Sequence, residues 1–190
     1  MAVLVFFLEE PSAKAMLEGV MPRLGLPESL EIRYVVFEGK QDMHKRLLLR
    51  LQHWQLPDSY FIVMRDQDSG DCRQIKDELL RLCQPSGQKD VLVRIACREL
   101  ESFYLGDLAA VEVGLGLTGL VHQQQKKKFR APDQLGNPVE ELGRLTKMRY
   151  QKIDGSRRIG QCLHLDGRNK SHSFNVLIEG VRRLMSVGIT

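Results

Sequence analysis

The amino-acid sequence predicts an α/β fold: a parallel, four-stranded, Rossmann-like sheet with helices on both faces, followed by a C-terminal helical extension. Short apolar runs alternate with segments of helical periodicity over the first hundred residues. The apolar runs are continuous, as in parallel strands that are buried on both faces. Beyond residue 105 helical patterns follow. We therefore expect an α/β core over residues 1–105 and a basic, mainly helical extension over residues 106–190, packed on the core as one compact domain.

Each element of this fold has a local signal. The strands are rich in β-branched and aromatic residues and are expected at residues 3–8, 32–37, 60–64 and 91–95. The helices of the core are expected at residues 11–24, 42–54, 72–82 and from residue 98 onward. Asp71, with Gln74 three residues later, has the spacing of a helix cap for the third of these. In the extension, residues 123–134 have the composition of an exposed loop, and helices are expected at 138–148, 156–163 and 173–185.

Acidic residues follow every predicted strand. Right-handed crossovers bring the carboxyl ends of parallel strands to one edge of a sheet, where ligands of open α/β sheets bind. The acidic residues expected at this edge are Glu9 and Glu10 after the first strand, Glu38 after the second, Asp66 and Asp68 after the third, and Glu99 and Glu101 beyond the fourth. Their recurrence favours a functional site at this edge.

The pair Asp66 and Asp68 has the pattern of a metal site. In an extended segment, side chains two residues apart point to the same side. Two carboxylates about 4 Å apart repel by roughly 4 kcal/mol at an effective dielectric near 20, and a divalent cation would offset that repulsion. Mg²⁺ typically takes one or two carboxylates together with water or phosphate. The alternative is an aspartate-rich surface turn. Asp71 is better explained as a helix cap than as a ligand.

Five sequence motifs resemble a known family. They are Leu8-Glu-Glu-Pro-Ser12, Arg65-Asp-Gln-Asp68 with Asp71-Cys72, the run from Arg94 to Asp107, Tyr150-Gln-Lys152 and Ser171-His-Ser-Phe174. Together they resemble a small bacterial Toprim-like family of undefined function, whose members are often encoded beside ABC-type AAA ATPases in loci suspected of phage defence. The resemblance to OLD-family nucleases, which also carry a Toprim domain, is more distant.

The resemblance implies a set of site residues and a cofactor. Glu9 would act as a metal ligand or as an acid/base, and Asp66 and Asp68 would bind Mg²⁺ or Mn²⁺. Glu101 would be a further metal ligand, and Lys152 would be a catalytic cation on the phosphate side. The alternatives are that Glu101 is an ordinary acidic residue at a helix start and that Lys152 is a solvated lysine.

The second part of the chain is basic. Residues 120–190 contain fourteen Lys and Arg against six Asp and Glu, a net charge of +8, whereas residues 1–119 have a net charge of −4. We expect Lys126, Lys127, Lys128 and Arg130 to contact nucleic-acid phosphates, with Phe129 available to stack on a base. The alternative is a charged loop that is only solvated.

Composition and motifs narrow the class of function. The sequence has no Gly-x-x-x-x-Gly-Lys loop, so any ATPase activity is expected in a partner. The four cysteines show no metal-binding spacing, and no apolar run approaches the length of a membrane span, which together predict a cytoplasmic protein without membrane association.

The leading hypothesis is therefore a metal-dependent nuclease that acts on DNA or RNA under the control of an ATPase. A non-catalytic regulator or sensor subunit of such a complex is the second hypothesis. A receiver-like signalling domain is disfavoured, because Cys97 rather than Ser or Thr follows the fourth strand.

Overall fold

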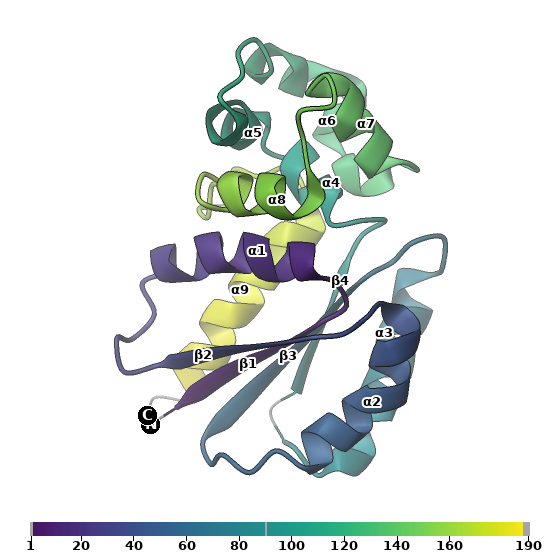
Figure 1. Cartoon of the computed structure of the whole chain (residues 1–190), viewed down its shortest axis with the longest axis vertical. Coiled ribbons are helices and arrows are strands. Elements are labelled where there is room, and N and C mark those ends of the chain that lie inside the picture. The colour runs from purple at the N-terminus through teal and green to yellow at the C-terminus, as the bar shows by residue number, and fades with distance from the viewer. Residues whose placement is uncertain (1, 90, 188–190) are drawn as a thin grey trace.

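A computed structural model describes residues 2–89 and 91–187. The described residues form one parallel sheet with the strand order β2-β1-β3-β4. Helices lie on both faces of the sheet (Figure 1), and this confirms the predicted Toprim-like fold class. The strands are β1 (Val3–Leu8), β2 (Glu31–Val36), β3 (Ser59–Asp66) and β4 (Val91–Ala96).

The central strand β1 explains the continuous apolar runs. All six of its residues are buried, because β2 and β3 pair with its edges and helices cover both faces. Leu4, Phe6 and Leu8 face one hydrophobic cluster, whereas Val3, Val5 and Phe7 face the other. A strand in this position has no solvent-exposed side, so it shows no alternation of polar and apolar residues.

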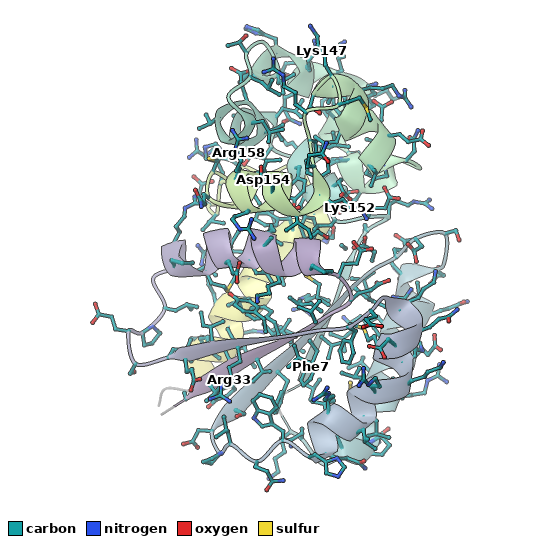
Figure 2. All side chains as sticks on the ribbon, viewed as in Figure 1. Phe7, Arg33, Lys147, Lys152, Asp154 and Arg158 are labelled. Carbon is teal, nitrogen blue, oxygen red and sulfur yellow. The ribbon has the colours of Figure 1, made fainter. Side chains whose placement is uncertain are left out.

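The two faces are covered by different parts of the chain. Helices α2 (Lys40–Gln52) and α3 (Cys72–Cys83) cover the face to which Phe7 belongs, as Figures 1 and 2 show. Helices α1 (Pro11–Val20) and α9 (His172–Val187) contribute to the cluster on the opposite face. The C-terminal helix is thus part of the sheet's own hydrophobic core.

The remaining helices form a second layer beyond α1 (Figure 1). They are α4 (Glu101–Leu105), α5 (Leu108–Leu115), α6 (Lys127–Arg130), α7 (Pro138–Leu145) and α8 (Lys152–Gly160). Helix α8 lies directly against α1, and the close contact depends on glycine. A Cβ atom on Gly19 would lie 2.6 Å from the backbone nitrogen of Gln161, and one on Gly160 would collide with the carbonyl oxygen of Met16. This contact fixes α8 relative to the loop that follows β1.

Several predicted boundaries differ from the observed ones. The first helix was expected to reach residue 24, but α1 ends at Val20 and a 3₁₀ turn, η1 (Met21–Arg23), follows, because Pro22 disfavours a continuing α-helix. Residues 123–134, expected as an exposed loop, contain α6, the end of the 3₁₀ turn η3 (Val121–Gln125) and the whole of the 3₁₀ turn η4 (Pro132–Gln134). A fourth turn, η2 (Gln84–Ser86), ends α3.

Two further findings concern the helices. Helix α8 begins at Lys152, four residues before the predicted start, and this places Lys152 in its first turn. Within residues 2–89 and 91–187, none of the helices has the length and apolar character needed to cross a membrane.

Candidate active site

Glu9 lies immediately after β1 and is only 8% exposed. Its Oε2 atom accepts a hydrogen bond of 3.1 Å from the backbone N–H of Asp66 and lies 3.7 Å from Nε of Arg65. Burial raises the pKa of Glu9, and neither the hydrogen bond nor Arg65 fully offsets this effect. The carboxyl ends of β1 and β3 are therefore joined through a carboxyl group with an increased affinity for protons.

Asp66 is the last residue of β3, and Ala96, the last residue of β4, lies beside it in the sheet. Burial of its carboxyl group raises the pKa of Asp66 well above its usual range, and repulsion from Glu101, Glu9 and Glu10 raises it further. The backbone N–H of Leu100 acts in the opposite direction. Acidic residues that follow three of the four strands thus interact at one edge of the sheet, whereas Glu38, after the second strand, is exposed and is not among the carboxylates that act on Asp66.

Glu101 is the first residue of α4 and is 1% exposed. Its Oε1 atom accepts a hydrogen bond of 2.7 Å from the hydroxyl of Tyr150, whereas Oε2 is buried and has no hydrogen-bond partner among the described residues. Burial raises the pKa of Glu101. A buried, unpaired carboxylate oxygen is costly, so a ligand for Oε2 would stabilise this group. We refer to Glu9, Asp66 and Glu101 as the inner acidic cluster.

Lys152 supplies a positive charge beside the inner acidic cluster. Its Nζ atom lies 3.1 Å from Oε2 of Glu10, and Figure 2 shows Lys152 at the start of α8, on the side facing α1. Partial burial works against its charge, but Glu10, Glu101 and Asp66 outweigh this effect and raise the pKa of Lys152. The lysine therefore remains protonated at neutral pH and interacts with the site that the resemblance implied.

Asp68 has different surroundings from Asp66. Extended backbone ends at Asp66, and at Asp68 the backbone is left-handed with φ of 55°. The prediction that both side chains leave an extended segment on the same side is therefore wrong. The Oδ2 atom of Asp68 lies 2.9 Å from Nζ of Lys40 and 3.6 Å from Nη2 of Arg65. We refer to Asp68, Lys40 and Arg65 as the outer ion-paired group.

Two other acidic residues near the strand ends cap helices. Oε2 of Glu99 accepts a hydrogen bond of 2.9 Å from the N–H of Val139, at the start of α7. Asp71 caps α3 by accepting bonds of 2.9 Å from the N–H groups of Arg73 and Gln74, as predicted.

The basic segment 126–130 agrees only in part with its predicted role. Phe129 is fully buried, so the prediction that it is available to stack on a base is wrong. Lys126, Lys127, Lys128 and Arg130 are all exposed, and Lys128 also forms an ion pair of 2.5 Å with Glu141. Short helical turns bury the aromatic ring and leave the cations at the surface. Contact of these cations with nucleic acid stays a prediction.

Residues that sequence reasoning missed complete the site. Arg65 lies between Glu9 and Asp68, and its motif was noted without a role for the arginine. Tyr150 donates to Glu101 from a position 49 residues later in the chain. The only sequence signal for Tyr150 was its place in the Tyr-Gln-Lys motif, two residues before Lys152.

The donor groups fit a hydrated hard cation better than a closed metal site. In the part of the chain that the structure describes, no three His, Cys, Asp or Glu side chains are close enough to hold one metal ion together. Mg²⁺ usually needs only one or two protein carboxylates and keeps several water ligands. Asp66 and the unpaired Oε2 of Glu101 meet that requirement.

The strand order and flanking helices define a Toprim-like α/β protein. The chain belongs to the DUF4276 family, described as a domain of unknown function, whose family model matches residues 8–182. Its fold is similar to the C-terminal region of the Burkholderia pseudomallei OLD protein, with a TM-score of 0.53 and 15% sequence identity over 98% of each chain. A search of curated proteins finds no match.

Proposed function

We propose that this protein is a Mg²⁺- or Mn²⁺-dependent nuclease that hydrolyses phosphodiester bonds in DNA or RNA. The observation that carries the proposal is the inner acidic cluster beside Lys152. Carboxyl groups with raised pKa values, crowded at the carboxyl ends of parallel strands, are typical of functional sites rather than of structural ion pairs. The fold shared with the OLD C-terminal region supports the same class of function.

Each residue would have a distinct role. Asp66 and Oε2 of Glu101 would hold the cation, which when bound lowers the pKa of a water ligand and stabilises charge on phosphate oxygens. Glu9, whose pKa is raised, is suited to exchange a proton with the attacking water or the leaving oxygen. Lys152 would contact a non-bridging phosphate oxygen, since its charge is maintained by the surrounding carboxylates.

The charge distribution supports a nucleic-acid substrate. Residues 120–190 carry a net charge of +8, and Lys126, Lys127 and Arg130 are exposed in the same part of the chain. Such cations attract a phosphate backbone regardless of base sequence.

An ATPase partner and a place in phage defence are further parts of the proposal. The chain has no phosphate-binding loop of its own. Support for both comes from the family that the sequence motifs resemble, because members of that Toprim-like family are often encoded beside ABC-type AAA ATPases. Purified protein should therefore be assayed with and without such an ATPase and ATP.

A non-catalytic regulator is the second candidate. It is favoured by the outer ion-paired group, in which the second aspartate of the Asp-x-Asp motif is already neutralised by Lys40 and Arg65. In that case the acidic edge would be retained for contact with a partner rather than for hydrolysis.

Cleavage assays distinguish the two candidates. Plasmid DNA, single-stranded DNA and tRNA are incubated with the protein in Mg²⁺, in Mn²⁺ and in EDTA, and the same assays are run on Glu9→Gln. Asp77→Asn is the matched control, because it also replaces a carboxylate by its amide but at an exposed position on α3. Both variants are first checked for unchanged folding by circular dichroism.

The nuclease proposal expects metal-dependent cleavage that Asp77→Asn retains and Glu9→Gln loses. Absence of cleavage in every condition, including with the ATPase and ATP, would favour the regulator. Cleavage that persists in EDTA would contradict the assignment of the inner acidic cluster as a metal-dependent active site. Cleavage by Glu9→Gln at the wild-type rate would contradict it as well.

A further inference from the structure

Tyr150 connects the helical extension to the inner acidic cluster. Its hydroxyl donates the hydrogen bond of 2.7 Å to Oε1 of Glu101. Because the single phenolic proton is used in this bond, the contact of 3.2 Å with Oγ of Ser156 is one in which the serine donates. The tyrosine therefore occupies one oxygen of the buried carboxylate and leaves the other, Oε2, unpaired.

The ring of Tyr150 is held in place from several sides. A Cβ atom on Gly155 would lie 2.5 Å from Cδ2 of Tyr150, so only glycine allows the ring this close to the backbone of α8. The backbone N–H of Tyr150 donates to Oγ1 of the buried Thr146 at 3.2 Å. The ring of Tyr104 packs against it, with the centroids 5.9 Å apart. Packing thus sets the hydroxyl position before any ligand binds.

A second buried tyrosine provides a contrast. Tyr104 is fully buried, and among the described residues its hydroxyl makes no hydrogen bond to a carboxylate, although the side chain of Ser156 and the charges of Glu101 and Asp66 act on its pKa. Two phenols therefore lie in one cluster, and only one of them contacts the carboxylate of Glu101.

We propose that Tyr150 is a positioning residue for Glu101: by holding Oε1, it directs Oε2 toward a divalent cation shared with Asp66. The inference rests on the proposed function for the identity of the cation, but it assigns a role to a residue outside the carboxylate set. Tyr150 and Lys152 are separated by Gln151, whose backbone is extended, so both side chains leave the segment toward the acidic edge. The segment 150–152 thereby orients one carboxylate and adds one cation.

Mn²⁺ affinity, measured by electron paramagnetic resonance, tests the proposal. Tyr150→Phe removes only the hydroxyl and should weaken Mn²⁺ binding by about 10–100-fold, as loss of an outer-shell partner does at other metal sites. Tyr104→Phe is the matched control and should bind Mn²⁺ within about twofold of the wild type, because it removes a buried hydroxyl that does not donate to Glu101. In the Glu101→Gln background, Tyr150→Phe should cause no further loss, because the tyrosine acts through Glu101.

Three results would overturn the role of Tyr150: equal losses in Tyr150→Phe and Tyr104→Phe, an undiminished loss in the Glu101→Gln background, or wild-type affinity in Tyr150→Phe. If Tyr150→Phe does not fold, the infrared carboxylate band of Glu101 provides the test. This band is the difference between the spectra of the wild type and of Glu101→Gln. A change of this band on addition of Mn²⁺ supports coordination through Oε2, and an unchanged band contradicts it.

Binding and cleavage separate this inference from the proposed function. Mn²⁺ binding that depends on Tyr150, in a protein without nuclease activity, would keep the positioning role and remove the nuclease. Metal-dependent cleavage with normal Mn²⁺ affinity in Tyr150→Phe would keep the nuclease and remove the positioning role.

Discussion

Asp66 and Asp68, two residues apart in the sequence, lie in opposite electrostatic surroundings. Asp66 belongs to the inner acidic cluster, where burial and neighbouring carboxylates raise its pKa well above the usual range. Asp68 belongs to the outer ion-paired group and lies 2.9 Å from Nζ of Lys40. The first carboxylate is destabilised by its neighbours, whereas the second is neutralised by them.

The difference indicates where a ligand is needed. An ion-paired carboxylate at the surface is already compensated, and such pairs contribute little to stability. A buried group of like charges is unfavourable in the folded protein and tends to be found where binding or catalysis requires it. The inner acidic cluster is therefore the part of the acidic edge that we expect to bind a cation.

The largest expected difference between the two aspartates is in catalysis. Asp66→Asn should lower the rate of metal-dependent cleavage by about 10²–10³-fold, the usual cost of removing a group that stabilises transition-state charge. Asp68→Asn should lower it by less than about tenfold, because that carboxylate mainly neutralises two cations. Single-turnover cleavage rates measure both. Equal losses would show that the two aspartates act as one site.

The next largest difference between Asp66 and Asp68 is expected in the stabilisation of the folded protein by Mg²⁺. In saturating Mg²⁺ at pH 8, the free energy of unfolding of the wild type should rise by about 2.7 kcal/mol when the ion is present at 100 times its Kd. Asp68→Asn should retain this increase, and Asp66→Asn should lose most of it. Urea unfolding with and without EDTA provides the measurement. A Mg²⁺ effect that survives in Asp66→Asn would place the ion elsewhere.

The two aspartates should differ by a smaller amount in their effect on the pH dependence of the free energy of unfolding. The folded-state pKa values of Glu9, Asp66 and Glu101 are raised, so the folded protein binds these protons more tightly than the unfolded chain. The stability that they contribute is fully present below their ordinary pKa values and is lost as the pH rises through the folded-state values. In EDTA, the wild type should therefore be more stable at pH 5 than at pH 8.

Substitution of Asp66 tests whether the inner acidic cluster causes this pH dependence of stability. Asp66→Asn removes one of the repelling charges and should increase stability at pH 8 by about 1–2 kcal/mol, with little effect at pH 5. Asp68→Asn should change the pH profile less than Asp66→Asn does, because the charge of Asp68 acts on Glu9, whose pKa is raised mainly by burial. Thermal unfolding in EDTA over this pH range would contradict the assignment if Asp66→Asn and wild type showed the same profile.

The smallest effect is expected in the outer ion-paired group. Lys40→Met should reduce the free energy of unfolding by less than about 1 kcal/mol, and 1 M NaCl should remove the difference, because exposed ion pairs are screened by salt. Lys45→Met, at an exposed position on the same helix, is the control. A larger loss that persists in salt would mean that Lys40 also stabilises the inner acidic cluster.

The sheet and its acidic edge were predictable because they depend on local patterns. The predicted strand at residues 3–8 has the observed bounds, and the other three agree within two residues, since buried parallel strands are continuous apolar runs. The start of α8 was missed, because residues 152–155 include Gly155 and lack apolar spacing. Gly155 leaves space for the ring of Tyr150 to pack against the backbone of α8, and no local sequence pattern indicates this contact.

The sequence by itself determined which residues stand at the ends of the strands and that several of them are acidic. Both follow from the order of residues along the chain and from the right-handed connections of a parallel sheet. Only the tertiary structure decided which carboxylates share a buried site, which one pairs with Lys40 and Arg65, and that Tyr150 holds Glu101. Desolvation and charge interactions depend on burial and on distances between atoms that are far apart in the chain, so residue spacing alone does not reveal them.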